Sequence, residues 1–398
     1  MGKYLNICNF YILLWCLYSL QGTLYASGSI ISQGILALVL VVSLFYTIYA
    51  NVKFELPPYM KVVNVMLAMF TVYGVALILS GETLIVREGY IGAVSNKDYL
   101  KNVLISFLPI YAFFVYTQIG QLTSDVIRRW LPVFLLIAIL SFFRQQSMSL
   151  AKAEELMSQQ EEFTNNTGYL LLAIMPLLLF VKKPFVQYAL LLVCCIFIIA
   201  AMKRGAILIF AMCLLLFIRS TLNTISYRRK IAVFILIAVS ILATLYYVSY
   251  MLDTSEYFNM RWDSTLVGDA SNREFTYPHL LRQIFYFATP MQFLFGRGAW
   301  GTLKVSDNFA HNDWLELGVN QGVLGVVIYI VYWVVFYVTT KKLRQYDQIH
   351  AALILTMFIL FMKTFFSMSY DDMGICTTMC IGYCMAYYKS DFRYKLPY

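Results

Sequence analysis

The stretch that decides the fold is residues 167–219, TGYLLLAIMPLLLFVKKPFVQYALLLVCCIFIIAAMKRGAILIFAMCLLLFIR. It consists of three apolar runs separated only by the pairs Lys182-Lys183 and Lys203-Arg204. A helix needs about 20 predominantly apolar residues to cross a bilayer, where backbone polar groups must be satisfied inside the segment. The stretch therefore predicts three consecutive membrane helices joined by very short turns.

The rest of the chain has the same composition. Of its 398 residues, 61% are hydrophobic and only 13% are charged, about half the charged fraction of an ordinary soluble domain. The mean hydropathy is +0.69. This composition excludes a soluble globular enzyme and leaves no room for a separate soluble domain. We therefore expect an all-α polytopic membrane protein with a single integral membrane domain over residues 1–398.

Apolar runs bounded by charge, Pro or Gly predict about twelve transmembrane helices. The expected spans are residues 7–26, 30–50, 62–80, 102–119, 130–143, 167–181, 185–202, 205–219, 231–250, 317–340, 351–369 and 374–388. The first is expected to be an uncleaved span, because it is longer than the apolar region of a signal peptide and lacks an A-x-A cleavage site.

The distribution of Lys and Arg predicts the orientation. With both termini in the cytoplasm, the cytoplasmic segments hold seventeen basic and four acidic residues, and the external segments hold twelve basic and seventeen acidic residues. This asymmetry agrees with the positive-inside rule. The net charge of +9 is then explained by membrane orientation, and we expect no nucleic-acid partner.

Two predicted external segments are long enough to build structure. Residues 144–166 have helix-forming composition and predict a surface helix. Residues 251–316 form a large loop between the ninth and tenth spans, rich in aromatic residues and containing His279 and His311. Aromatic residues at a bilayer surface are typical of an interfacial belt, and aromatic residues with cations also suit a substrate cavity. The two interpretations are compatible.

Three groups of residues are candidates for chemistry. Lys203-Arg204 falls at an external helix end, where the orientation rule disfavours basic residues, so snorkelling and function are equally good interpretations. Arg273-Glu274 taken alone is a solvated ion pair. The third group is the run at residues 295–331, FGRGAWGTLKVSDNFAHNDWLELGVNQGVLGVVIYIV, in which His311-Asn312 precedes a Gly-x-x-Gly pair opening a span. Such glycines permit close backbone approach.

This run resembles the C-terminal signature of the O-antigen ligase and O-antigen polymerase superfamily of bacterial membrane glycosyltransferases. The matching residues are His311, Asn312, Trp314, Leu315, Gly322 and Gly325. Upstream elements match in order, namely TNNTGYLLLAIMPL from Thr164, KRGA with Arg204, SNR with Arg273, and FGRGAW. The resemblance covers residues 160–340. Family members often carry an acidic residue where this chain has Asn320, so no carboxylate role is carried over there.

The resemblance implies a fold related to the type C glycosyltransferases and an inverting, metal-independent transfer without a cofactor. The implied donor is a glycan linked to undecaprenyl diphosphate, and a glycan is the acceptor, on the external face of the bacterial inner membrane. Arg204 and Arg273 would bind the diphosphate, and His311 would activate the acceptor hydroxyl or contact the leaving phosphate. The secondary candidates are Arg297 for phosphate contact, Asn312 for substrate binding, and Glu274 for orienting Arg273.

Within the family, the sequence favours a polymerase of lipid-linked repeat units, for O-antigen, capsule or exopolysaccharide, acting with a possible chain-length regulator. A ligase that transfers finished polymer to the lipid A core of lipopolysaccharide is the first alternative. A transporter or flippase of lipid-linked glycans is the second, although the two six-helix halves show no correspondence. All eight cysteines lie in apolar runs, which indicates packing residues, neither disulfides nor metal ligands.

Overall fold

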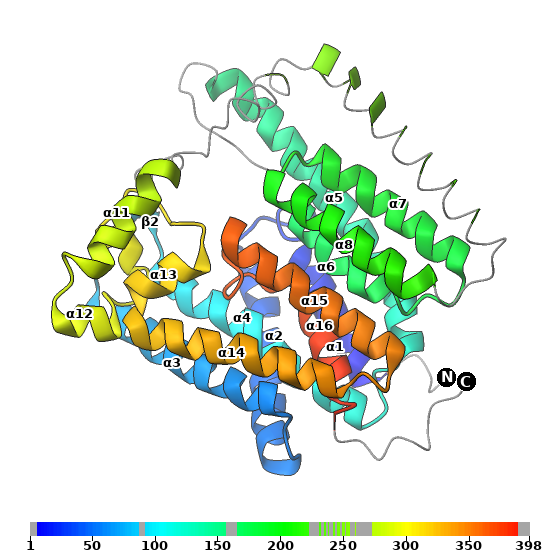
Figure 1. Cartoon of the computed structure of the whole chain (residues 1–398), viewed down its shortest axis with the longest axis horizontal. Coiled ribbons are helices and arrows are strands. Elements are labelled where there is room, and N and C mark those ends of the chain that lie inside the picture. Colours follow the sequence, from blue (N-terminus) through cyan, green and yellow to red (C-terminus); the bar gives the residue numbers. More distant parts are fainter. Residues whose placement is uncertain are drawn as a thin grey trace.

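The computed structural model describes residues 6–86, 92–156, 165–222 and 273–388, together with isolated positions between 231 and 259. Figure 1 shows its arrangement as a bundle of helices with smaller elements gathered at one end. The elements are α1 (Ile7–Ser19), α2 (Ile30–Lys53), α3 (Pro58–Ser80), β1 (Leu84–Val86), β2 (Gly92–Val94), α4 (Asn96–Gln118), α5 (Ser124–Leu156), α6 (Thr167–Leu178), α7 (Pro184–Ala200), α8 (Arg204–Leu222), α11 (Arg273–Phe285), α12 (Pro290–Phe295), η1 (Gly301–Lys304, a 3-10 helix), α13 (Asp313–Asn320), α14 (Gly322–Lys342), α15 (Asp347–Phe366) and α16 (Ile375–Met385).

The described part of the chain is an all-α membrane protein, as its composition predicts. Seven helices, α2, α3, α4, α5, α8, α14 and α15, are long and apolar enough to cross a membrane. The helices α1, α6, α7 and α16 are apolar but shorter. The only sheet within the described ranges is the two-stranded antiparallel pair β1–β2. The predicted span 231–250 lies outside the described residues except for isolated positions.

Burial divides the helices into an inner and an outer set. The inner helix α4 contacts α2, α3 and α16, and its aromatic side chains, such as Phe107, Tyr111 and Phe113, are fully buried. The outer helices α2 and α3 expose apolar side chains, with Val52 and Leu79 more than four-fifths exposed. Extended apolar surfaces of this kind mark contact with a membrane.

The elements that do not span gather at one end of the bundle. The β1–β2 hairpin, α11, α12 and α13 lie there, beside the first residues of α4 and α14 (Figure 1). We call this the hairpin end. Tyr73 of α3 donates a hydrogen bond to the carbonyl oxygen of Phe295 at 2.5 Å, which ties α12 to a membrane helix. The hairpin itself is not foreseen by the sequence analysis.

The predicted span 317–340 is wrong at its start, because the chain breaks between α13 and α14. Gly322 has a φ of 65°, a left-handed conformation that glycine adopts at little cost. A Cβ at Gly322 would lie 2.6 Å from backbone atoms of Phe293 and Leu294. The close backbone approach expected from the glycine pair is thus confirmed at Gly322, where it seats α12.

Two other predicted boundaries are also wrong. The span 7–26 ends as a helix at Ser19, where the chain turns and Arg144 donates a hydrogen bond to the carbonyl oxygen of Gln21 at 2.7 Å. The separate surface helix expected at 144–166 is instead a continuation of α5, which runs unbroken to Leu156. No Pro or Gly interrupts the sequence after Arg144, so nothing ends the helix at the first charged residue.

Candidate functional site

The first part of the site is the start of α8. A tight turn after α7 places Met202 in a left-handed conformation, with a φ of 53°, and Arg204 becomes the first residue of α8. Lys203 and Arg204 are both half-buried. The positive end of the helix dipole disfavours cations at this position. The helix dipole therefore does not explain the Lys203-Arg204 pair.

Two helices, α6 and α15, pack closely against this helix start. A Cβ at Gly205 would lie 2.5 Å from the Tyr169 hydroxyl of α6 and 2.7 Å from Cβ of Phe366 in α15. A Cβ at Gly168 would lie 2.9 Å from Cβ of Ala206. Both glycines are needed because any side chain would separate the helices. The TGY and KRGA elements of the sequence thus lie against each other.

Arg273 reaches the same place from the external loop. It is the first residue of α11, and its Nη2 donates a hydrogen bond to the carbonyl oxygen of Phe366 at 3.2 Å. Phe366 is the last residue of α15 and packs against Gly205. Glu274 is exposed, and within the described residues no ion pair joins it to Arg273. The carbonyl of Phe366, rather than Glu274, therefore positions the guanidinium.

His311 lies beside these cations. It precedes α13 with a φ of 50°, a left-handed conformation that is uncommon for non-glycine residues. Its side chain is accessible to solvent but lies in a recess among protein atoms. Burial lowers the pKa of His311 below its ordinary value of 6.5, and the charges of Lys203 and Arg273 lower it further. The imidazole is therefore neutral near pH 7, and these three residues share one region.

We call Lys203, Arg204 and Arg273, together with the neutral His311 beside them, the cation cluster. Its members come from the α7–α8 turn, α8, α11 and the segment before the cap of α13. Of the predicted catalytic residues, Arg273 and His311 thus lie close enough to interact, and Arg204 is the chain neighbour of Lys203, which also lies near His311. Sequence spacing alone gives no sign of this convergence.

The secondary candidates have structural contacts. The Asn312 side chain is the N-cap of α13 and accepts hydrogen bonds from the backbone N–H groups of Trp314 and Leu315, at 3.0 and 3.2 Å. Arg297 donates from Nη2 to the Gln283 side chain at 3.0 Å, which braces its loop against α11. Both residues hold elements of the site in place, and neither has a described contact with the cation cluster.

Two buried carboxyl groups on α13 were not foreseen. Asp313 accepts hydrogen bonds from the Tyr329 hydroxyl at 2.5 Å and the backbone N–H of Ser369 at 2.8 Å. Glu316 accepts from the backbone N–H of Ala310 at 2.5 Å and lies 2.6 Å from the Thr302 hydroxyl. Burial raises the pKa of Asp313 to about 8 and that of Glu316 to about 7. Acids at positions one and four of a capped helix are the signal that the sequence offered.

Asn320 makes contacts that suit an amide side chain. Its Nδ2 donates to Glu316 at 3.2 Å, and its Oδ1 accepts from the backbone N–H of Thr302 at 2.9 Å. Only an amide side chain both donates and accepts in this way. A carboxylate at this position would put a second buried acid beside Glu316.

Lys363 is a buried cation in the membrane helix α15. Its Nζ lies 2.5 Å from the Asp372 carboxylate and 5.3 Å from the centroid of the Tyr169 ring. The adjacent residues Asp371 and Asp372 have different surroundings. Asp372 is exposed but paired, whereas burial and then the charge of Asp372 raise the pKa of Asp371 to about 7.

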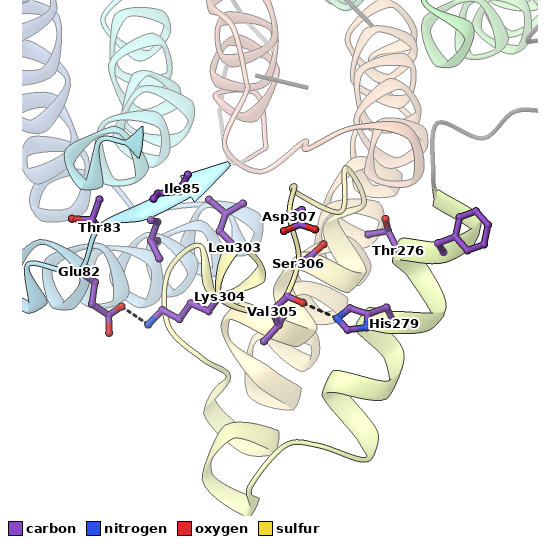
Figure 2. A pocket seen from close by; sticks show the side chains of 12 residues that line it. Glu82, Thr83, Ile85, Thr276, His279, Leu303, Lys304, Val305, Ser306 and Asp307 are labelled. Carbon is purple, nitrogen blue, oxygen red and sulfur yellow. Dashed lines mark hydrogen bonds and ion pairs between the residues drawn. The ribbon is translucent and has the colours of Figure 1, made fainter. Parts of the chain in front are cut away.

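A polar cleft of about 1370 Å³ lies at the hairpin end between β1, η1 and α11 (Figure 2). Lys304 forms an ion pair with Glu82 across it at 2.5 Å, and His279 Nε2 lies 2.7 Å from the carbonyl oxygen of Val305. The lining residues are Glu82, Thr83, Leu84, Ile85, Phe275, Thr276, His279, Leu303, Lys304, Val305, Ser306 and Asp307. The cleft does not contain the cation cluster, but Thr276 is one helical turn from Arg273.

Within the described ranges, no three His, Cys, Asp or Glu side chains are grouped so that they could hold a metal ion. No protein-family model matches the chain, and no curated protein is significantly similar to it. The fold and site therefore define the class of protein: a multi-pass helical membrane protein with a cation cluster and a polar cleft at one end of its bundle.

Proposed function

We propose that this protein is an inverting, metal-independent glycosyltransferase of the O-antigen polymerase type. It would join oligosaccharide repeat units carried on undecaprenyl diphosphate, on the external face of the bacterial inner membrane. The observation that carries the proposal is that Arg273 binds the carbonyl of Phe366, on which the first turn of α8 with Arg204 packs, and that Lys203 and Arg273 lie near His311. Three residues singled out by separate motifs would have no reason to meet if each were a scattered surface charge.

The chemistry requires cations at a leaving diphosphate. The acceptor oxygen attacks the anomeric carbon from the face opposite the diphosphate, the bond from that carbon to the phosphate oxygen breaks, and negative charge develops on the diphosphate. Arginines stabilise such charge through bidentate, permanently charged donors. Arg204 and Arg273 would supply this stabilisation.

His311 would take the proton of the acceptor hydroxyl. A general base must be unprotonated at the working pH and must be accessible to the hydroxyl. The lowered pKa of His311 keeps the imidazole neutral, and its side chain is exposed to solvent. These two properties favour the role of base over that of phosphate ligand, because a phosphate ligand would gain from being charged.

The cleft beside α11 would hold saccharide residues. Its hydroxyl, carboxylate and amine groups, including Thr276, Asp307 and Lys304, suit the hydroxyl groups of a glycan. Its position one turn along α11 from Arg273 would place a bound sugar next to the diphosphate.

The proposal includes the finer topology expected from the sequence. It comprises about twelve spans with both termini cytoplasmic and a fold related to the type C glycosyltransferases. Residues 251–316 would form the external loop, and residues 160–340 the common core of the family. Seven candidate spans and a site built at one end of the bundle support this topology.

The test is the surface glycan of a deletion strain complemented with single variants. Arg204→Ala, Arg273→Ala and His311→Ala should each abolish long-chain polysaccharide while the protein still inserts in the membrane. Arg344→Ala, an exposed cation after α14, is the matched control and should leave the glycan ladder unchanged.

The pattern on the gel also separates the two family activities. A single repeat unit on the lipid core indicates loss of a polymerase, and complete polymer stranded on its carrier indicates loss of a ligase. Normal ladders from all three variants would contradict the catalytic assignment.

A further inference from the structure

Tyr169 is a buried side chain whose hydroxyl makes no hydrogen bond within the described residues. It is the third residue of α6 and is only 8% exposed. Its Oη atom is fully shielded from solvent and lacks a hydrogen-bond partner among those residues. A buried hydroxyl without a partner is costly, because it has lost its hydrogen bonds to water. Such a group in a native fold needs an explanation.

The hydroxyl points at the first turn of α8. Its oxygen lies against Gly205, 2.5 Å from where a Cβ would be. The first hydrogen bond of this helix joins the N–H of Ile207 to the carbonyl oxygen of Lys203. The N–H groups of Gly205 and Ala206 precede it and so have no acceptor within the helix. The start of a long helix with such N–H groups favours an anion.

Two further cations lie around the same hydroxyl. The Arg273 guanidinium is close enough to interact electrostatically with Tyr169 Oη. The Lys363 ammonium lies over the Tyr169 ring, 5.3 Å from its centroid, and is held there by Asp372. A neutral O–H donor, helix N–H donors and fixed cations thus surround one small, shielded region.

We propose that Tyr169 is a phosphate-binding residue, whose hydroxyl donates a hydrogen bond to the diphosphate of a prenyl-linked substrate at the start of α8. The proposal rests on the proposed function and extends it to a residue outside the arginine and histidine motifs. The ring would set the position of the oxyanion between Gly205 and Arg273. The buried hydroxyl gains its partner only when the anion is bound.

The test uses the full-length protein in nanodiscs, with farnesyl diphosphate as the probe and farnesol as the uncharged reference. Tyr169→Phe removes only the hydroxyl and should weaken farnesyl diphosphate binding about 10-fold or more, the typical effect of losing a hydrogen bond to a charged group. The melting temperature without ligand should stay the same or rise, because the hydroxyl that is removed has no partner. Tyr116→Phe, on a buried ring packed against Tyr11 and Tyr46 near the other end of α4, is the control and should bind as the wild type does.

The melting temperature of Tyr169→Phe without ligand separates a lost hydrogen bond from a folding defect. Gly205→Ala crowds the Tyr169 hydroxyl and Phe366, so it should weaken binding and also lower the melting temperature. If Tyr169→Phe and Gly205→Ala bind farnesyl diphosphate as tightly as the wild type while Arg273→Ala does not, the role of Tyr169 is overturned and the proposed function stands. If the wild type binds farnesyl diphosphate no better than farnesol, both are overturned.

Discussion

The starts of α8 and α13 lie near each other but differ in how their polar groups are satisfied. Each helix follows a non-glycine residue in a left-handed conformation, Met202 at 53° and His311 at 50°. The start of α13 is closed by the cap of Asn312 and by two buried acids in its first turn that accept hydrogen bonds from other protein groups. The start of α8 carries cations, against the dipole, and faces a buried hydroxyl without a partner in the described structure.

Under the proposed function, the start of α13 has a structural role and the start of α8 has a binding role. The polar groups at α13 are satisfied by other protein groups, so this helix start holds the loop between α12 and α13 in shape. The groups at α8 form an arrangement that an anion would complete. Variants at α8 should therefore change activity with little effect on stability, and variants at α13 should do the reverse.

The largest expected effect is that of Arg204→Ala on glycosyl transfer. Removing one fixed donor to a developing oxyanion typically lowers the rate by about 100-fold to 1,000-fold. Transfer measured with purified protein should fall by this amount, while the melting temperature in detergent changes little. A lower melting temperature together with an unchanged specific activity would contradict the expected difference between the two helix starts.

Next in size is the effect of Glu316→Ala on stability. The substitution removes the acceptor for the Ala310 N–H and the neighbour of Thr302 and Asn320, and so leaves buried polar groups unsatisfied. The free energy of unfolding should fall by about 3 kcal/mol, measured by denaturation of the purified protein. Glu274→Ala, at an exposed acid, is the matched control and should change it by less than about 0.5 kcal/mol. Equal losses in the free energy of unfolding at the two positions would contradict a structural role for the start of α13.

A smaller effect is expected at the α13 cap. Asn312→Ala should cost about 1 kcal/mol of stability, and Asn312→Asp less, because a carboxylate also accepts from the N–H groups of Trp314 and Leu315. Both are measured by thermal melting. If Asn312→Asp loses transfer activity while its stability is kept, Asn312 contacts substrate as the family resemblance implies.

The smallest expected effect is on the pH dependence of activity, through the pKa of His311. Its pKa is lowered in the folded protein, so the base is active near pH 7 and activity is lost as the pH falls through that lowered value. Lys203→Gln removes one of the charges that lower the pKa. The pKa should rise toward its ordinary value, and the acid limb of kcat/KM should move to higher pH. If the acid limb of kcat/KM does not move, the group that titrates there is not His311.

The apolar helices could be predicted from the sequence because lipid imposes one simple requirement on composition. Their ends could not, since they depend on contacts distant in sequence, such as Arg144 with Gln21 and Gly322 with Phe293. The same holds for the site. Arg204, Arg273 and His311 stand out as unusual residues, but the carbonyl of Phe366 carries no sequence signal, because every residue has a carbonyl. The TGY element contains Tyr169, but the sequence does not show that its hydroxyl is buried without a partner.

The most direct test of the central claim is a double-mutant cycle on farnesyl diphosphate affinity, with Arg204→Ala, Arg273→Ala and the double variant. If both arginines hold one diphosphate, the two losses should be non-additive, with a coupling energy of about 0.5 kcal/mol or more. Losses that add within experimental error, or no loss in either single variant, would contradict a shared diphosphate site at the start of α8.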